Sequence, residues 1–291
     1  MGTEMAYLIG MILGNGEIQQ GRTETIVTIE IPHKNLITDD NKDVKVYVQA
    51  SLIDIERIIR PLLGAEINYS QGRSSTRLSF QKNNAEYVMK QILRYVSNGS
   101  HHTYMQMSEE LFDISVDEKK SLLRGFADVT GYIRRTNLAY NIKGHHRVYL
   151  EIPRNWKMVI DIANMLKDVD IPIQTIDFGH PNFRDSNLIK YNEGMPNYWK
   201  KEHQIKIYAN EFLPIGFNIK HKQEALEKYS DELLKHLNPE KTHKYYWEKN
   251  IKKGKEKLKH PGENDPSLPK EIRGKHFNSW TELARVLGYD K

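Results

Sequence analysis

Asn15 and Thr130 are the first candidate functional residues of this sequence, because each stands directly before a glycine at the end of a repeated segment. Asp128, a carboxylate, lies two residues before Thr130. Oxygen atoms of these kinds can hold a hard divalent cation, and charged oxygens hold it far better than a neutral amide does. The chain has no cysteine, which excludes a disulfide framework, a thiolate nucleophile and a Cys-ligated zinc site.

Other common catalytic and membrane motifs are missing from the sequence. It contains no phosphate-binding loop, dinucleotide fingerprint or HExxH motif. His101 and His102 are adjacent, so on a strand their side chains would point apart, and we expect turn residues and not a metal site. The apolar run from Ala6 to Leu13 is too short to span a bilayer. We therefore expect a cytoplasmic protein without a membrane partner.

Two ordered sequence matches indicate an internal duplication. The segment LIGMILGNGEIQQ, from Leu8 to Gln20, matches LRGFADVTGYIRR, from Leu123 to Arg135, with Gly at the third and ninth positions of both. Further along, VTIEIP from Val27 to Pro32 matches VYLEIP from Val148 to Pro153. The offsets are 115 and 121 residues, so the two copies keep the same order.

Hydrophobic periodicity predicts the same order of elements, α-β-β-α-β-β-α, in both copies. The first copy is expected to contain helices at 4–13, 48–63 and 84–96 and strands at 17–20, 25–31, 65–69 and 76–81. The second is expected to contain helices at 117–127, 156–167 and 223–237 and strands at 132–136, 147–152, 173–178 and 203–208. Gly14 and Gly16 are expected to stop the first helix through their tolerance of positive φ. A short helix is predicted at 280–287, and an insertion at 180–202 is too long for an ordinary hairpin loop.

The repeated helices carry small residues where a partner helix would pack. Ala6, Gly10 and Gly14 share one face of the first helix, and Ser121 and Gly125 share one face of its counterpart. Small side chains let two helix backbones approach more closely than usual. If the two helices pack about a pseudo-twofold axis, their carboxyl ends bring Asn15 and Thr130 together.

The two nonapeptides, Leu8 to Gly16 and Leu123 to Gly131, each at the start of an αββαββα unit, resemble the motifs of single-chain LAGLIDADG endonucleases. The resemblance covers about residues 7–237. It implies an α+β fold with two pseudosymmetric repeats, whose motif helices form the central interface and whose antiparallel sheets form a saddle over double-stranded DNA. It also implies Mg²⁺ or another divalent cation, held by acids at the eighth motif position.

Both eighth positions depart from the family pattern, since Asn15 and Thr130 replace the expected carboxylates. The metal-ligand set that the resemblance implies here is Asn15, Gly14, Asp128 and Thr130. Its catalytic set adds residues at strand ends that would order the attacking water. These are His33, Arg154 and Lys82.

The resemblance leaves several functions open. The first is a monomeric, site-specific DNA endonuclease of the homing or restriction type, in an impaired or inactivated form. The second is a non-catalytic DNA-binding regulator or an RNA maturase that kept the saddle and lost the acids. The expected organisation is a first repeat at 1–100, a second at 101–237 and a basic C-terminal extension at 238–291.

Residues that would face DNA should alternate along the strands, because an antiparallel sheet with helices on one face leaves the other face polar. The predicted DNA-binding residues are Gln19, Arg22, Thr28, Arg73, Arg77, Arg134, Arg135, Asn137, Arg147, Lys206, Lys252, Lys253 and Lys255. The net charge of +5 is local, since residues 235–275 hold twelve Lys and Arg against six Asp and Glu. We expect the lysines of this extension to bind phosphates and not to read bases.

Overall fold

The computed structural model describes residues 1–41, 43–64, 66–97, 99–135, 146–180, 202–234, 269–272 and 275–288, and it contains both predicted repeats. The first repeat comprises α1 (Thr3–Asn15), β1 (Gly16–Gln20), β2 (Glu24–Pro32), the 3-10 helix η1 (His33–Asn35), α2 (Val44–Leu63), β3 (Asn68–Gln71), β4 (Ser75–Asn83) and α3 (Tyr87–Tyr95). The second comprises α4 (Val116–Thr130), β7 (Gly131–Arg134), β8 (Arg147–Ile152), α5 (Trp156–Asp168), β9 (Thr175–His180), β10 (Glu202–Tyr208), α6 (Ala209–Phe212) and α7 (Lys220–Leu234). The predicted order of elements is confirmed, with α6 added in the second repeat.

Short elements connect the two repeats, and the ends of some helices differ from prediction. The connection contains β5 (Val96–Ser97), β6 (Gln106–Met107) and the 3-10 helix η2 (Glu109–Phe112). Helix α2 begins four residues earlier than expected because the Asp43 side chain accepts hydrogen bonds from the Lys45 and Val46 backbone N–H groups. Its end at Gly64 is confirmed, where a left-handed backbone at φ 54° closes the helix.

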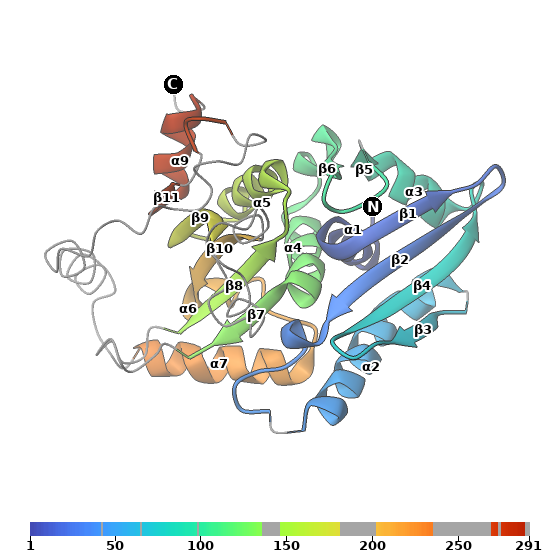
Figure 1. The fold of residues 1–291 in the computed structure, drawn as a ribbon, viewed down its shortest axis with the longest axis horizontal. Helices are drawn as coiled ribbons and strands as arrows, with labels where there is room; N and C mark the ends of the chain where they lie inside the picture. The colour runs from blue at the N-terminus through green and yellow to red at the C-terminus, as the bar shows by residue number, and fades with distance from the viewer. Residues whose placement is uncertain are drawn as a thin grey trace, which may run out of the picture.

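Helices α1 and α4 lie side by side at the centre of the molecule, with one sheet on each side (Figure 1). A Cβ atom at Gly10 would overlap the backbone carbonyl of Leu122, and one at Gly125 would overlap that of Tyr7. The Ser121 hydroxyl donates to the Thr3 carbonyl at 2.7 Å across the same interface. The predicted close packing of the two motif helices is therefore confirmed.

The predicted stop of α1 at Gly16 is confirmed, but Gly14 does not end the helix, and neither glycine has a positive φ. The helix continues through Gly14 to Asn15, and Gly16 has an extended backbone at φ −90°. A Cβ at Gly14 would lie 2.8 Å from methyl groups of Thr130 and Val129. Gly14 is thus required by the closeness of α4, and positive φ is not involved.

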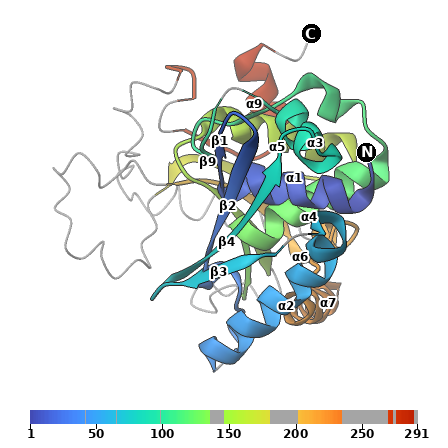
Figure 2. The same cartoon turned by 90° about the vertical axis from the view of Figure 1, so that its right-hand side faces the viewer.

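Each repeat contributes one antiparallel sheet whose inner face covers the helices. The first sheet has the order β1-β2-β4-β3, and the second has the order β11-β9-β10-β8-β7, in which β11 is the later strand His276–Phe277. Along β2 the side chains of Val27, Ile29 and Ile31 are fully buried, while Thr28 and Glu30 between them point outward. Figure 2 shows helices α1 and α3 together on the right-hand side of the strands of the first sheet.

Residues 275–288 pack onto the second repeat. Strand β11 (His276–Phe277) pairs with β9, and α9 (Trp280–Leu287), which matches the predicted range, buries Trp280 and Leu283. The sequence predicted an extension outside the repeats, but these residues complete the second sheet. Of the helices in the described ranges, none is both long and apolar enough to cross a membrane.

Candidate nucleic-acid interface

The carboxyl end of α4 is capped by two asparagine side chains. Asn15 Nδ2 donates to the Val129 carbonyl at 2.9 Å, and Asn35 Nδ2 donates to the same oxygen at 2.8 Å. Both asparagines are buried, and Val129 belongs to the last turn of α4, where carbonyl groups lack helical donors. Asn15 therefore points an N–H donor toward α4, although the family resemblance implies an acid at this eighth motif position.

Thr130, at the matching position of the second repeat, is bonded within its own helix. Its hydroxyl donates to the Phe126 carbonyl at 2.7 Å, and only 1% of the residue is exposed. This is the bond that Thr commonly makes to the carbonyl four residues earlier. Gly14 contributes no side-chain ligand and packs against Thr130.

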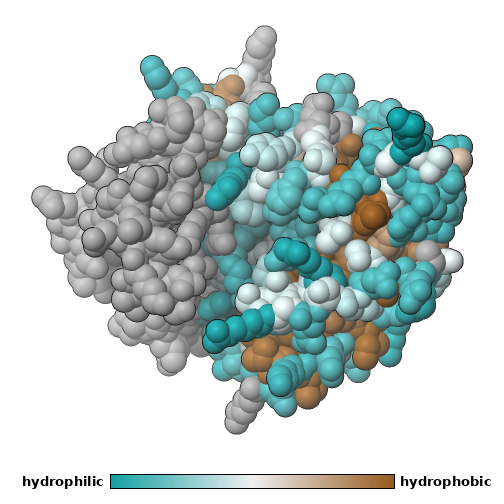
Figure 3. Space-filling model, turned by 45° about the vertical axis from the view of Figure 1, so that its right-hand side comes forward, coloured by the Kyte–Doolittle hydropathy of each residue, from teal (hydrophilic) through white to brown (hydrophobic). Residues whose placement is uncertain are grey.

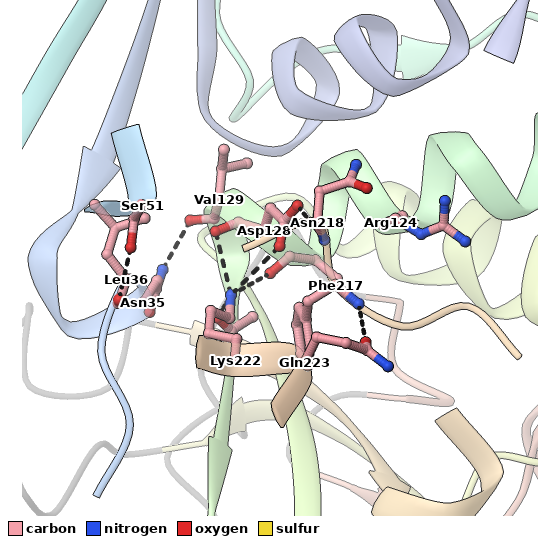
Figure 4. A network of polar contacts seen from close by, with 12 residues as sticks. Asn35, Leu36, Ser51, Arg124, Asp128, Val129, Phe217, Asn218, Lys222 and Gln223 are labelled. Atoms are coloured by element: carbon pink, nitrogen blue, oxygen red, sulfur yellow. Dashed lines mark hydrogen bonds and ion pairs between the residues drawn. The ribbon is translucent and has the colours of Figure 1, made fainter. Parts of the chain in front are cut away.

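Asp128 belongs to a closed polar network under the end of α4 (Figure 4). It is fully buried, and its Oδ2 accepts from the Tyr7 hydroxyl at 2.8 Å and from the Asn218 N–H at 3.1 Å. The ammonium of Lys222, also fully buried, lies 3.9 Å from Asp128 Oδ1. Burial raises the pKa of Asp128 and lowers that of Lys222, so desolvation opposes the charged form of each.

Lys222 also serves as a cation at the carboxyl end of α4. Its Nζ donates to the carbonyls of Ala127, Asp128 and Gly131 at 3.2, 3.3 and 3.0 Å. A positive charge is favourable there because the helix end carries partial negative charge. Sequence reasoning missed both Lys222 and Asn35, since nothing in their local pattern indicates contact with a helix about 90 residues away in the chain.

The predicted divalent-metal ligands do not fit a metal. Asn15 and Thr130 use their donors on carbonyl groups, and Asp128 is enclosed with Lys222. Within the described ranges, no group of three or more His, Cys, Asp or Glu side chains could hold a metal ion. The surroundings of Asp128 do not favour its predicted metal role, because the carboxylate is fully buried, its Oδ2 accepts two hydrogen bonds and its Oδ1 faces the Lys222 ammonium.

The three strand-end candidates do not form one cluster. His33 Nε2 is hydrogen-bonded to Thr76 Oγ1 at 3.0 Å, beside the start of β4, and burial lowers its pKa. Lys82 lies near the other end of β4, where it pairs with Glu86 at 2.6 Å. Arg154 is exposed on a left-handed backbone at φ 59°. His33 and Lys82 thus lie at opposite ends of β4.

The connection between the repeats lies beside the end of α1. The His102 N–H donates to the Gly16 carbonyl at 2.8 Å, and the Asn155 amide donates to the His102 carbonyl at 2.8 Å. His101 and His102 lie in a turn, as predicted, but their rings are 4.1 Å apart and face each other instead of pointing apart. Burial, followed by the nearby His101, lowers the pKa of His102 to about 4.

This shift predicts acid sensitivity. With a pKa of about 4 when folded and 6.5 when unfolded, His102 takes up its proton mainly on unfolding between these pH values. The free energy of unfolding should therefore fall as pH is lowered from 6.5 to 4, by at most about 3 kcal/mol from this group. Urea titrations should show that His102→Gln loses this part of the pH dependence. An unchanged slope in His102→Gln would contradict the assignment.

The outward face of the first sheet is polar and accessible. The strand register places Gln19, Ile26 and Gln81 in one row, and Glu17, Thr28 and Ser79 in the next. A further row contains Glu30, Arg77 and Ser70. The surface that Figure 3 colours is mostly hydrophilic with separate apolar patches. The predicted alternation along these strands is confirmed.

The outward face of the second sheet is occupied by internal contacts. Lys206 pairs with Asp177 at 2.5 Å, and Lys34 from the first repeat pairs with Glu151 at 2.5 Å. Tyr132 and Tyr149 stack with ring centroids 5.0 Å apart. Lys206, a predicted DNA contact, is thus already bound to a carboxylate.

The remaining predicted DNA-binding residues lie in different settings. Arg22 and Arg73 are exposed in the β1–β2 and β3–β4 turns. Arg134 lies over the Tyr132 ring, and Arg147 over the Tyr208 ring. Arg135 contacts Asp40 at 3.5 Å and lies over Tyr229, next to α7. Outside the described residues lie Asn137, Lys252, Lys253 and Lys255.

Comparisons with known proteins give structural matches only. No protein-family model matches the chain, and neither does any curated protein. A mesophilic variant of the homing endonuclease I-DmoI is 13% identical with a TM-score of 0.39, over 76% of this chain and 95% of that one. Full-length DUF199/WhiA from Thermatoga maritima is 13% identical with a TM-score of 0.41, over 99% of this chain and 81% of that one. The N-terminal LAGLIDADG domain of DUF199/WhiA is 11% identical with a TM-score of 0.37, over 83% and 88%.

The arrangement of the elements defines the fold. Two glycine-containing helices pack side by side, and each is followed by an antiparallel sheet of the same repeat. This is an α+β, LAGLIDADG-like fold.

Proposed function

We propose that this chain binds double-stranded DNA and does not cleave it through a metal held at the motif positions. The observation that carries the proposal is the orientation of Asn15, whose amide donates to the Val129 carbonyl, so that neither eighth motif position, Asn15 or Thr130, presents a carboxylate. A regulator that recognises DNA needs the sheets but not the acids. The non-catalytic alternative is therefore the one that the geometry favours.

The first sheet supports DNA binding through the chemistry of its outward face. Gln19, Arg77 and Gln81 are exposed amides and a guanidinium, groups that can form bidentate contacts with adenine and guanine in the major groove. Strands in the major groove are an established way of presenting such side chains. The face also holds Glu17, Glu24 and Glu30, whose charges are matched only when Arg77 is counted together with Arg22 and Arg73 in the adjoining turns. The phosphate affinity that we expect from the lysine-rich residues 252–259 stays a prediction.

An endonuclease activity would require acids near the two helix ends. Selection from a randomised duplex library, followed by incubation with Mg²⁺ or Mn²⁺, separates binding from cleavage. We expect wild-type protein and Asn15→Asp to retain duplexes and to leave them uncut. Metal-dependent cleavage by the wild type would overturn the proposal, and cleavage by Asn15→Asp alone would identify a nuclease inactivated at this residue.

Asn15→Asp should also destabilise the fold. The change replaces the Nδ2 donor by an oxygen that faces the Val129 carbonyl, so two acceptors meet without a proton. We expect a loss of roughly 1 to 3 kcal/mol in the free energy of unfolding, measured by urea titration without metal. Asn41→Asp is the matched control, because Asn41 uses its side-chain oxygen to accept from the Thr38 N–H at 2.7 Å. Equal stability of both variants would show that the Asn15 donor is unimportant.

A further inference from the structure

The two sheets differ most clearly at one pair of matched residues. Glu30 of VTIEIP and Glu151 of VYLEIP occupy the same place in the two repeats. The Glu30 side chain is 45% exposed, whereas that of Glu151 is 4% exposed. In the described part of the chain, Glu30 is hydrogen-bonded to Ser75 and Arg77 of its own sheet, whereas Glu151 is bound by Lys34 from the other repeat and by Gln204. The duplication has therefore produced one open face and one closed face.

The closed face is held by ion pairs that DNA would have to break. Asp177, 1% exposed, binds Lys206 and also His276 from β11. Gln204 is 4% exposed and donates to Glu151. Removing one partner from a buried ion pair costs more than a single bidentate base contact contributes to discrimination. These residues are poorly placed to read bases.

The open face can exchange its contacts for DNA at little cost. The Arg77 side chain is 64% exposed, and its pair with Glu30 is long, at 3.3 Å. Gln19 and Gln81 are exposed and lie on either side of Ile26, which is 37% exposed in the middle of the face. Adjacent strands are about 4.8 Å apart, so Gln19, Ile26 and Gln81, which lie in one row, could contact neighbouring positions in a DNA groove.

We propose that sequence reading is confined to the half of the DNA site that lies under the first sheet. Gln19, Arg77 and Gln81 determine this specificity, with Ile26 as an apolar contact for a thymine methyl group. The second sheet acts as a rigid support whose internal contacts persist in the complex. This inference rests on the proposed function, since it specifies how the same saddle recognises double-stranded DNA.

Selection of duplexes from a randomised library by the full chain tests the inference. We expect conserved bases in one half of the selected site and near-random bases in the other half. Equal information in both halves would overturn the inference while supporting DNA binding. Failure to retain any duplex would overturn the proposed function, and the inference with it.

Variants on the open face identify the half-site that is read. Arg77→Ala and Gln81→Ala should each weaken binding to the selected duplex by roughly 5- to 150-fold and relax selection at one or two positions. Binding to a scrambled duplex should change little. The matched control is Arg57→Ala, which removes a 74% exposed guanidinium from α2. If Arg77→Ala and Arg57→Ala have equal effects on the selected duplex, Arg77 does not read sequence.

Discussion

Gly10→Ala should destabilise the protein by roughly 3 to 5 kcal/mol, an unusually large loss for the addition of one methyl group. The added Cβ would overlap the Leu122 carbonyl oxygen and lie 2.9 Å from the Phe126 nitrogen. Both atoms belong to the backbone of α4, so no side-chain rotation can relieve the overlap. The two central helices would have to separate, and their interface is buried throughout. Chemical denaturation followed by circular dichroism measures the effect.

The matched glycine of the second repeat, Gly125, allows a second, independent test of the same packing. Gly125→Ala places a Cβ against the Tyr7 carbonyl from the opposite helix and should cost a similar amount. Gly64→Ala is the control, because a Cβ there meets nothing within 4 Å and costs only about 1 kcal/mol for its left-handed backbone. If Gly10→Ala is no worse than Gly64→Ala, the close approach of the helices is not what requires glycine.

Lys222→Met should destabilise the fold by roughly 3 to 5 kcal/mol. The change removes the ammonium that donates to the carbonyls of Ala127 and Asp128 in α4 and of Gly131 just after it, and it takes the lysine charge away from the buried Asp128 carboxylate. Urea titration near neutral pH gives the free energy of unfolding. A control is Lys220→Met, whose side chain is 80% exposed and which should change stability by less than about 0.5 kcal/mol.

A double variant separates the buried charge of Asp128 from the loss of the lysine contacts. Adding Asp128→Asn to Lys222→Met removes the unpaired carboxylate and should restore part of the lost stability. The Asn side chain can still accept from the Tyr7 hydroxyl. If the two changes are additive, Lys222 and Asp128 do not interact.

Sequence patterns predicted the repeats because their signals are local. Glycines spaced along Leu8 to Gly16 and Leu123 to Gly131, followed by alternating strands, are enough to define two copies of one plan. The same patterns could also select the outward-facing residues of the first sheet, since alternation follows directly from strand geometry. These parts of the fold depend on neighbours within a few residues.

The parts that prediction missed depend on contacts between distant residues. Asn35 and Lys222 reach the end of α4 from 94 and 95 residues away along the chain, respectively. No local pattern distinguishes a lysine that will be buried under a helix from the exposed Lys220 two residues earlier. The burial of Asp128 and the closed face of the second sheet have the same origin. Candidates chosen from motif and strand positions therefore included Asp128 and Lys206, whose side chains are bound by other residues of the fold.

Strand β11 pairs with Ile176 and Asp177 at the edge of β9. It covers the free edge of β9, where unpaired backbone N–H and C=O groups would otherwise be available to a strand of another molecule. Loss of residues 275–291 would expose that edge together with the apolar surface under Trp280 and Leu283. We therefore expect that trimming of the chain before residue 275 would favour aggregation before it affected the central helices.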